Sequence, residues 1–282
     1  MKLFPRYAAI LALLVAPCWN GRVEAAAPVW KVTAPDGATL YLGGSIHALR
    51  KADHPLPQAF DRALANSARV IFEVEGEPSA ALIKSGEYPK GDTLKNHVDP
   101  RTYSYLTKVF NRMGVPESKF SRYRPWLLTV MLMSPSLRGL SADLGVEGYV
   151  KQRARAAKKP TSGLVGVREH MSVFTGLTDR QSEGVLLLNF IPSTGDSYSS
   201  MVSTWKRGDA ETAWRNTRAG FADYPAFGER ILDARNRLWI PKIEGYLRSG
   251  QTCMVVVGLA HMGGPHGVLA LLKARGYQIE QL

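Results

Sequence analysis

The strongest constraint on the fold is a strand–turn–helix–strand pattern that occurs at both ends of the chain. Near the start, an apolar run at residues 39–42 is followed by a glycine-rich turn, a helical pattern at residues 57–68 and a second apolar run at residues 70–74. Two strands joined by one helix over so short a stretch form a βαβ unit, and its strands lie parallel in one sheet.

The end of the chain repeats this order. Residues 254–257 are a continuous apolar run, as expected for a strand buried on both faces, and a helical pattern at residues 268–274 and a short strand at residues 277–279 follow. Ahead of the first unit, residues 29–32 and 39–42 flank an Asp-Gly turn that predicts a hairpin. The pattern predicts an α/β fold with a mixed, largely parallel central sheet.

The part between the two units is predicted to be mainly helical. Six stretches have apolar spacing typical of helices, and one short strand is expected at residues 163–166; the helical stretches are residues 99–112, 126–133, 144–158, 178–188, 209–217 and 227–247. Apolar residues make up 45% of the sequence and charged residues 21%, with no change in composition along the chain. We expect one domain over residues 28–282, with a helical insertion at about 95–247.

The first residues are typical of an export signal. A basic start is followed by an apolar run at residues 7–17 and by small residues at 25–27, which predicts a signal peptide over residues 1–25 with cleavage near 25–27. The run is shorter than the roughly 20 residues that a membrane span needs, so no transmembrane segment is expected after cleavage. Pro17 directly before Cys18 fits a lipobox poorly, which favours a periplasmic protein over a lipid-anchored one.

The net charge of +12 indicates a preference for anionic partners in general terms only. The basic residues are scattered, and export argues against nucleic acid as a partner. Loss of Cys18 with the signal peptide would leave Cys253 alone in an apolar strand, where a buried structural role is expected. Nothing in the sequence indicates an oligomeric state.

Three side chains with catalytic or metal-binding chemistry lie at or near strand ends. His47 and His261 each close a Gly-x-x-His turn after a predicted strand, and Glu73 lies near the end of the apolar strand that follows the first unit. The carboxyl ends of parallel strands meet at one edge of a sheet, so we expect His47 and Glu73 to lie together. If the second unit joins the same sheet in the same direction, His261 lies at that edge too. Two imidazoles and one carboxylate are the minimum for a divalent metal site with open positions.

Several longer motifs resemble those of the TraB/PrgY/GumN family, most closely its bacterial GumN-like branch. They are residues 42–47 (LGGSIH), 71–75 (IFEVE), 124–126 (RPW), 145–147 (GVE), 234–239 (ARNRLW) and 257–264 (VGLAHMGG). The resemblance implies an architecture like that of erythromycin esterases and ChaN-like haem-binding lipoproteins. It also implies metal-dependent proteolysis with Mn²⁺ or Co²⁺, as described for the animal TIKI members. One departure is Leu164-Val165-Gly166, where the family often has Leu-Glu-Thr.

The resemblance places the family's catalytic residues on His47, His261, Glu73 and the Arg-Asn pair at Arg235 and Asn236. The leading expectation is a metal-dependent hydrolase of a peptide or ester bond, with His47, His261 and Glu73 holding Mn²⁺, Co²⁺ or Zn²⁺. Glu73 would be the third ligand or the general base, and Arg235 would stabilise the oxyanion or be a surface residue.

Two alternatives stay open. In the first, His47 and Glu73 act as an acid/base pair without metal, as the resemblance to erythromycin esterases allows. In the second, the chain is a non-catalytic periplasmic binding protein for a haem-like or polysaccharide ligand, attracted by the basic surface. The expected partner is otherwise a peptide or small-molecule substrate.

Overall fold

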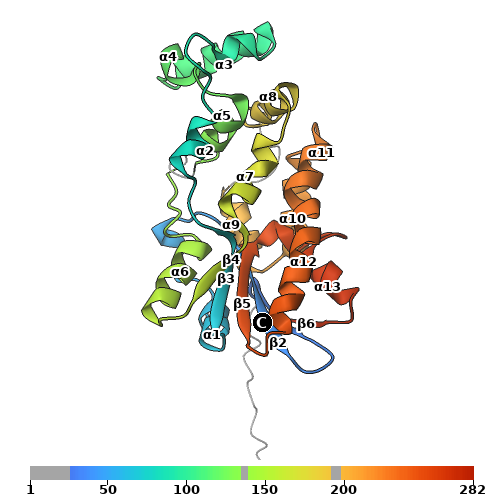
Figure 1. The fold of residues 1–282 in the computed structure, drawn as a ribbon. Helices are drawn as coiled ribbons and strands as arrows, with labels where there is room; N and C mark the ends of the chain where they lie inside the picture. The colour runs from blue at the N-terminus through green and yellow to red at the C-terminus, as the bar shows by residue number, and fades with distance from the viewer. Residues whose placement is uncertain (1–25, 135–138, 192–197) are drawn as a thin grey trace, which may run out of the picture.

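A computed structural model describes residues 26–134, 139–191 and 198–282. The fold is built on one six-stranded sheet with the order β4-β3-β5-β2-β1-β6 (Figure 1). Its strands are β1 Val29–Thr33, β2 Thr39–Ser45, β3 Arg69–Glu75, β4 Thr161–Gly166, β5 Cys253–Gly258 and β6 Gln278–Gln281. β4, β3, β5 and β2 are parallel, while β1 pairs antiparallel with both β2 and β6. The predicted mixed, largely parallel α/β sheet is therefore confirmed.

Most of the remaining described chain is helical. The α-helices are α1 Ala59–Ala65, α2 Ala80–Lys84, α3 Pro100–Arg112, α4 Glu117–Phe120, α5 Pro125–Leu132, α6 Val146–Ala156, α7 Val167–Thr175, α8 Asp179–Leu188, α9 Tyr198–Lys206, α10 Ala210–Ala219, α11 Pro225–Gly228, α12 Ala234–Leu247 and α13 Val268–Lys273. Short 3₁₀ segments are η1 Lys51–Asp53, η2 Leu94–Asn96 and η5 Leu259–His261. A π-helical turn, η4 Glu229–Asp233, joins α11 to α12.

The path of the chain through the sheet places helices on both faces. From β2 to β3 and on to β4, the chain moves toward one edge and passes through α1 and then α6; it returns from β4 to β5 through α12. Crossovers between parallel strands are right-handed, so the outward and return helices lie on opposite faces. Figure 1 shows α1 and α6 on one side of the sheet and α12 and α13 on the other.

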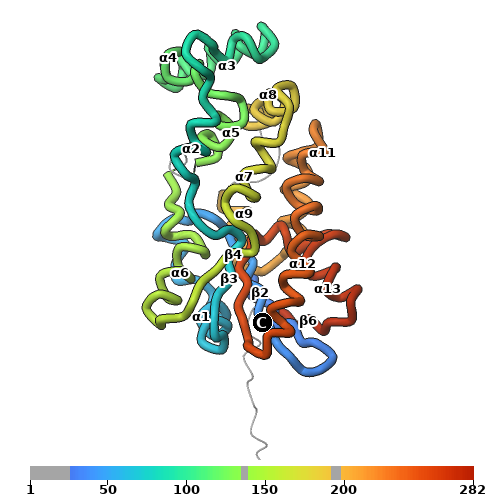
Figure 2. The backbone as a smooth tube through the Cα atoms, viewed as in Figure 1, coloured from blue at the N-terminus to red at the C-terminus, as the bar shows by residue number. Residues whose placement is uncertain are grey.

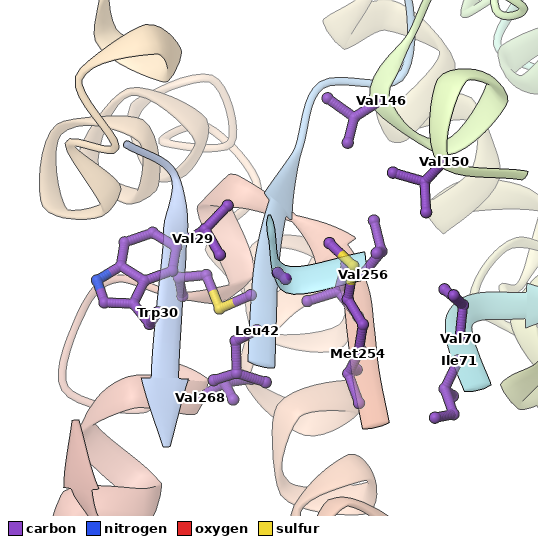
Figure 3. Packing of buried hydrophobic residues seen from close by; sticks show 14 of the residues in the cluster. Val29, Trp30, Leu42, Val70, Ile71, Val146, Val150, Met254, Val256 and Val268 are labelled. Carbon is purple, nitrogen blue, oxygen red and sulfur yellow. The ribbon is translucent and has the colours of Figure 1, made fainter. Parts of the chain in front are cut away.

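The main core fills both faces of the sheet. Every residue of β5 is buried, as the continuous apolar run predicted. Figure 3 shows Val146 and Val150 of α6 and Val268 of α13 among the strand side chains, and all three are fully buried. Burying an aliphatic side chain of this size contributes roughly 1.5–3 kcal/mol. This packing holds the strands, and so the positions of their carboxyl ends, in place.

A second apolar cluster lies away from the sheet, where α3, α4, α5 and α8 pack together (Figures 1 and 2). Its fully buried members include Leu94, Leu106 and Leu186, and Phe110 stacks on Phe120 with ring centroids 4.6 Å apart. The helices of this cluster fall inside the helical insertion that the sequence predicts. That residues 28–282 form a single domain stays a prediction.

The structure differs from the expected elements at several points. The helix predicted at residues 227–247 is divided by the π-turn η4, while α9 is a helix that the apolar spacing did not predict. Among the described residues, no helix is long and apolar enough to cross a membrane. The predicted signal peptide and Cys18 lie outside the described residues.

Candidate active site

The register of the parallel strands brings the predicted residues to one edge of the sheet. β2 and β5 end side by side, with Ser45 opposite Gly258, and β3 pairs with β5 through Phe72 opposite Val256. His47 follows the end of β2, His261 closes the short η5 turn after β5, and Glu73 is the residue after Phe72. The three side chains therefore meet at the carboxyl edge: His47 and Glu73 as strand direction predicted, and His261 because β5 joins the same sheet in the same direction.

Gly258 marks the point where these side chains converge. A methyl group on its Cα would lie 3.5 Å from His261 Cδ2, 3.7 Å from His47 Nε2 and 3.9 Å from Glu73 Oε2. The backbone N–H of Gly258 also donates to Glu73 Oε2 at 3.3 Å. The glycine thus leaves open a small space that two imidazole edges and one carboxylate oxygen border.

Glu73 is held as a carboxylate by its neighbours. Arg235 Nη2 donates to Glu73 Oε1 at 2.6 Å, and both side chains are only 8% exposed. Burial by itself raises the pKa of Glu73. The opposing effect of Arg235, and after it of the imidazoles of His261 and His47, outweighs burial, so the net pKa is well below its usual value. Glu73 therefore remains ionised across the physiological range.

His261 is buried, neutral and fixed in one tautomer. The amide nitrogen of Asn236 donates to the backbone carbonyls of His261 and His266, so its Oδ1 is the acceptor that lies 2.7 Å from His261 Nδ1. The proton of His261 is then on Nδ1, which leaves the lone pair on Nε2. Burial lowers the pKa of His261 to about 3, and its ring lies against Trp239 with centroids 4.5 Å apart.

His47 has a different environment. Its ring is 67% exposed, and Nδ1 lies 2.8 Å from Oε1 of Glu147, which also accepts a 2.6 Å hydrogen bond from Ser45 Oγ. The Glu147 carboxylate raises the pKa of His47, although solvent around the exposed ring screens this attraction. Burial raises the pKa of Glu147, but the charge of His47 and the hydrogen bonds from His47 and Ser45 together bring it below its usual value. Glu147 contacts Nδ1 of His47, so Nε2, the ring nitrogen that borders the space beside Gly258, has no contact with Glu147.

Two further residues complete the site, and the sequence did not single out either as functional. Glu147 lies in the first turn of α6, which approaches so closely that a Cβ on Gly145 would meet the carbonyl oxygen of His47 at 2.2 Å. His170 lies on α7, with Nδ1 3.0 Å from Nη2 of Arg235. The available signal for Glu147 was its place in the family motif at residues 145–147, to which no role was assigned; His170 had no comparable signal.

The side chains at this edge suit a divalent metal ion in donor chemistry but are not arranged around one. In the described ranges, no group of three or more His, Cys, Asp or Glu side chains has an arrangement that could hold a metal ion. In donor chemistry, however, the set fits: imidazole and carboxylate suit Zn²⁺ and Mn²⁺, and both Nδ1 atoms are held by second residues, as in most histidine metal sites. The residues that would hold the ion are His47, His261 and Glu73.

The site combines two Gly-x-x-His turns with a buried glutamate that is paired with an arginine, all at the carboxyl edge of an α/β sheet. These features are the ones on which the resemblance to the TraB/PrgY/GumN family rests. The sequence profile of the TraB/PrgY/gumN family matches residues 28–281, so the chain belongs to the TraB/PrgY/gumN family.

Two relatives extend this comparison. The chain is 26% identical over 252 residues to the uncharacterized protein YbaP of Escherichia coli K12, covering 87% of this chain and 92% of that protein. The YbaP of Shigella flexneri matches to the same extent. No solved structure matches the chain, so the expected likeness to erythromycin esterases and ChaN stays a prediction.

Proposed function

We propose that this protein is a periplasmic hydrolase of peptide or ester bonds that works with a divalent metal ion. The observation that carries the proposal is the convergence of His47 Nε2, the His261 ring and Glu73 Oε2 on the open space beside Gly258. Such a space, bordered by nitrogen and oxygen donors, suits the attack of water on a carbonyl carbon.

The electrostatics favour ligand roles for two of these residues. A general base works best with a pKa near the working pH, and Glu73 is kept far below it by Arg235. Burial likewise makes His261 a weak base but keeps it neutral, with its Nε2 lone pair available. A permanent carboxylate and a permanently neutral imidazole suit cation binding better than proton transfer.

The metal ion, when bound, would acidify a water molecule and polarise the carbonyl oxygen. The residues of the chain do the rest. Arg235 keeps Glu73 ionised, Asn236 keeps the Nδ1 proton of His261 in place, and Glu147 orients the ring of His47. Each partner fixes one side chain before substrate arrives, which is what preorganisation requires.

One observation favours a metal-free variant of the same hydrolase. His47 and Glu147 form a hydrogen-bonded imidazole–carboxylate pair, the arrangement that general bases use to gain basicity. In this second candidate the unprotonated form of His47 takes the proton of the attacking water, with Glu147 as its partner in place of Glu73. Because the pKa of His47 is raised to about 9, this form is a minor fraction at neutral pH and grows as the pH rises.

Metal analysis beside activity measurements separates the two versions. The purified protein, stripped of metal and reloaded with Mn²⁺, Co²⁺ or Zn²⁺, is assayed with fluorogenic peptides and 4-nitrophenyl esters, beside His47→Ala, His261→Ala and the surface control His266→Ala. One bound ion per wild-type chain, lost in the first two variants only, together with metal-dependent turnover, is the expected result. Turnover that persists without metal would support the His47–Glu147 version, and no turnover under any condition would refute both.

A further inference from the structure

His170 has no role in the proposed chemistry so far, although it lies at the site. It belongs to the first turns of α7, which starts at Val167 directly after β4 ends at Gly166, so the helix begins at the carboxyl edge of the sheet. Its Nδ1 lies 3.8 Å from Glu73 Oε1 and 3.0 Å from Arg235 Nη2, and its side chain is 28% exposed. His170 therefore lies between the buried ion pair and the solvent.

The contact with Arg235 determines where the proton of His170 resides. A guanidinium group has donors and no lone pair to accept with, so His170 Nδ1 must be the acceptor in this hydrogen bond. The ring is then neutral, with its proton on Nε2. Burial and the charge of Arg235 lower the pKa of His170 to about 4, in agreement with a neutral ring.

The two neutral histidines of the site are thus complementary. His261 has a lone pair on Nε2, whereas His170 has a proton there. In the part of the chain that the structure describes, no hydrogen-bond acceptor is recorded for Nε2 of His170. Arg235 cannot supply the same donor from Nη2, because its two protons are directed at Glu73 and His170.

We propose that His170 is a further catalytic residue, whose Nε2–H donates a hydrogen bond to the substrate oxygen that becomes negative during attack. The inference rests on the proposed hydrolase function and assigns the oxyanion donor of that site. A neutral imidazole whose Nδ1 accepts from Arg235 is a suitable donor, because its proton is held on Nε2 and the hydrogen bond to the oxygen is retained throughout. Arg235 acts through it as a positioning residue that fixes the tautomer.

The tautomer is measured first, and without any need for turnover. In ¹⁵N-histidine NMR spectra of the full-length wild-type protein at pH 7, we expect His170 to have a protonated Nε2 and an unprotonated Nδ1. A proton on Nδ1 would overturn the proposal, because the ring could then neither accept from Arg235 nor present the donor.

The second measurement concerns the donor itself. The assay uses an ester or peptide that the wild-type protein hydrolyses. His170→Phe is expected to lower kcat for this substrate about 100- to 1,000-fold with KM nearly unchanged. His170→Gln, whose amide can accept from Arg235 and still donate, should retain most of kcat. The matched control is His266→Phe, since His266 is exposed and, among the described residues, only its backbone carbonyl takes part in a hydrogen bond. Equal kcat in wild type and His170→Phe would overturn the proposal while leaving the hydrolase function standing.

If the wild type turns over no substrate, the hydrolase function fails, and a binding probe still decides the role of His170. Methylphosphonate, a tetrahedral oxyanion, is titrated into the same variants. His170→Phe is expected to bind it about tenfold to a hundredfold more weakly than wild type or His266→Phe, the value of one hydrogen bond to a charged group. Equal affinity in all three proteins would refute the donor role.

Discussion

The two Gly-x-x-His turns have the same sequence pattern but opposite environments. His47 is largely exposed and contacts a carboxylate, so its pKa is raised, whereas His261 is buried against a neutral amide and its pKa is lowered. The glycines differ as well. A Cβ on Gly44 would meet the Leu259 side chain at 2.6 Å, while one on Gly258 would enter the space between the site residues.

The difference shows that the motif positions a histidine without setting its chemistry. In both turns the glycine removes a side chain at the end of a parallel strand, and the histidine follows three residues later. The helices then supply the partner, Glu147 from α6 in one case and Asn236 from α12 in the other. His47 is suited to exchange a proton with solvent, and His261 is suited to remain neutral.

The largest effect is expected from exchanging each glycine for alanine. Gly258→Ala should fold normally, because the added methyl is at ordinary contact distances and the backbone is not in the left-handed region. It should nevertheless lower kcat/KM about 100-fold, because the methyl group fills the space in which water and substrate would be positioned. Gly44→Ala should instead lower the free energy of unfolding by about 1–3 kcal/mol through overpacking against Leu259. Denaturant unfolding and kinetics on both variants test the contrast, which fails if Gly258→Ala is fully active.

Exchanging the partners should reverse the pKa shifts. Asn236→Asp places a carboxylate where Oδ1 now lies 2.7 Å from His261 Nδ1, so the pKa of His261 should rise by about 1 to 3. Glu147→Gln removes the charge beside His47, so the pKa of His47 should fall toward its usual value of 6.5. Both are measured by NMR titration of the metal-free protein. An unchanged His261 pKa in Asn236→Asp would show that burial alone determines it.

The strand ends of the site were predictable from sequence, and the helical partners were not. A continuous apolar run such as that of β5 and the direction of strands within one βαβ unit are local properties. Strand direction placed His47 and Glu73 on one edge, and the family resemblance was needed to add His261. Glu147 and His170 reach the site only because α6 and α7 have particular rotations against the sheet. Those rotations depend on packing between segments far apart in the chain, which apolar spacing within one helix does not specify.

Arg235 and Asn236 illustrate the same limit. The resemblance identified the pair, but not that the two side chains have different partners, Glu73 for Arg235 and His261 for Asn236. The π-turn η4 directly before them changes the phase of the helix, and π-turns are frequent at functional sites. A period of 3.6 residues assumed over the whole predicted helix gives no indication of this turn.

The opposite pKa shifts also predict opposite pH dependences of stability. His261 has a folded pKa of about 3 against 6.5 when unfolded, so its contribution is present above pH 6.5 and is lost as the pH falls toward 3. His47 has a raised folded pKa, about 9, so its contribution is present below pH 6.5 and is lost as the pH rises through 9.

Solvent screening makes the loss at His47 the smaller of the two, because its ring is 67% exposed. Urea unfolding of metal-free protein from pH 4 to 10 should therefore show a steeper acid limb, and His261→Gln should flatten that limb alone. An acid limb that is unchanged in His261→Gln would contradict the assignment of a buried, neutral imidazole.

The smallest expected effect concerns Ser45, the residue that lies opposite Gly258 in the sheet. Its hydroxyl donates to the same oxygen of Glu147 that contacts His47, so it orients the carboxylate rather than the imidazole. Ser45→Ala should lower the free energy of unfolding by about 1 kcal/mol, the net value of one hydrogen bond. It should also raise the pKa of His47 slightly, because Glu147 then interacts with His47 alone. If Ser45→Ala instead lowers the pKa of His47, the hydroxyl holds Glu147 in reach of the ring, and the His47 turn depends on its strand as well as on α6.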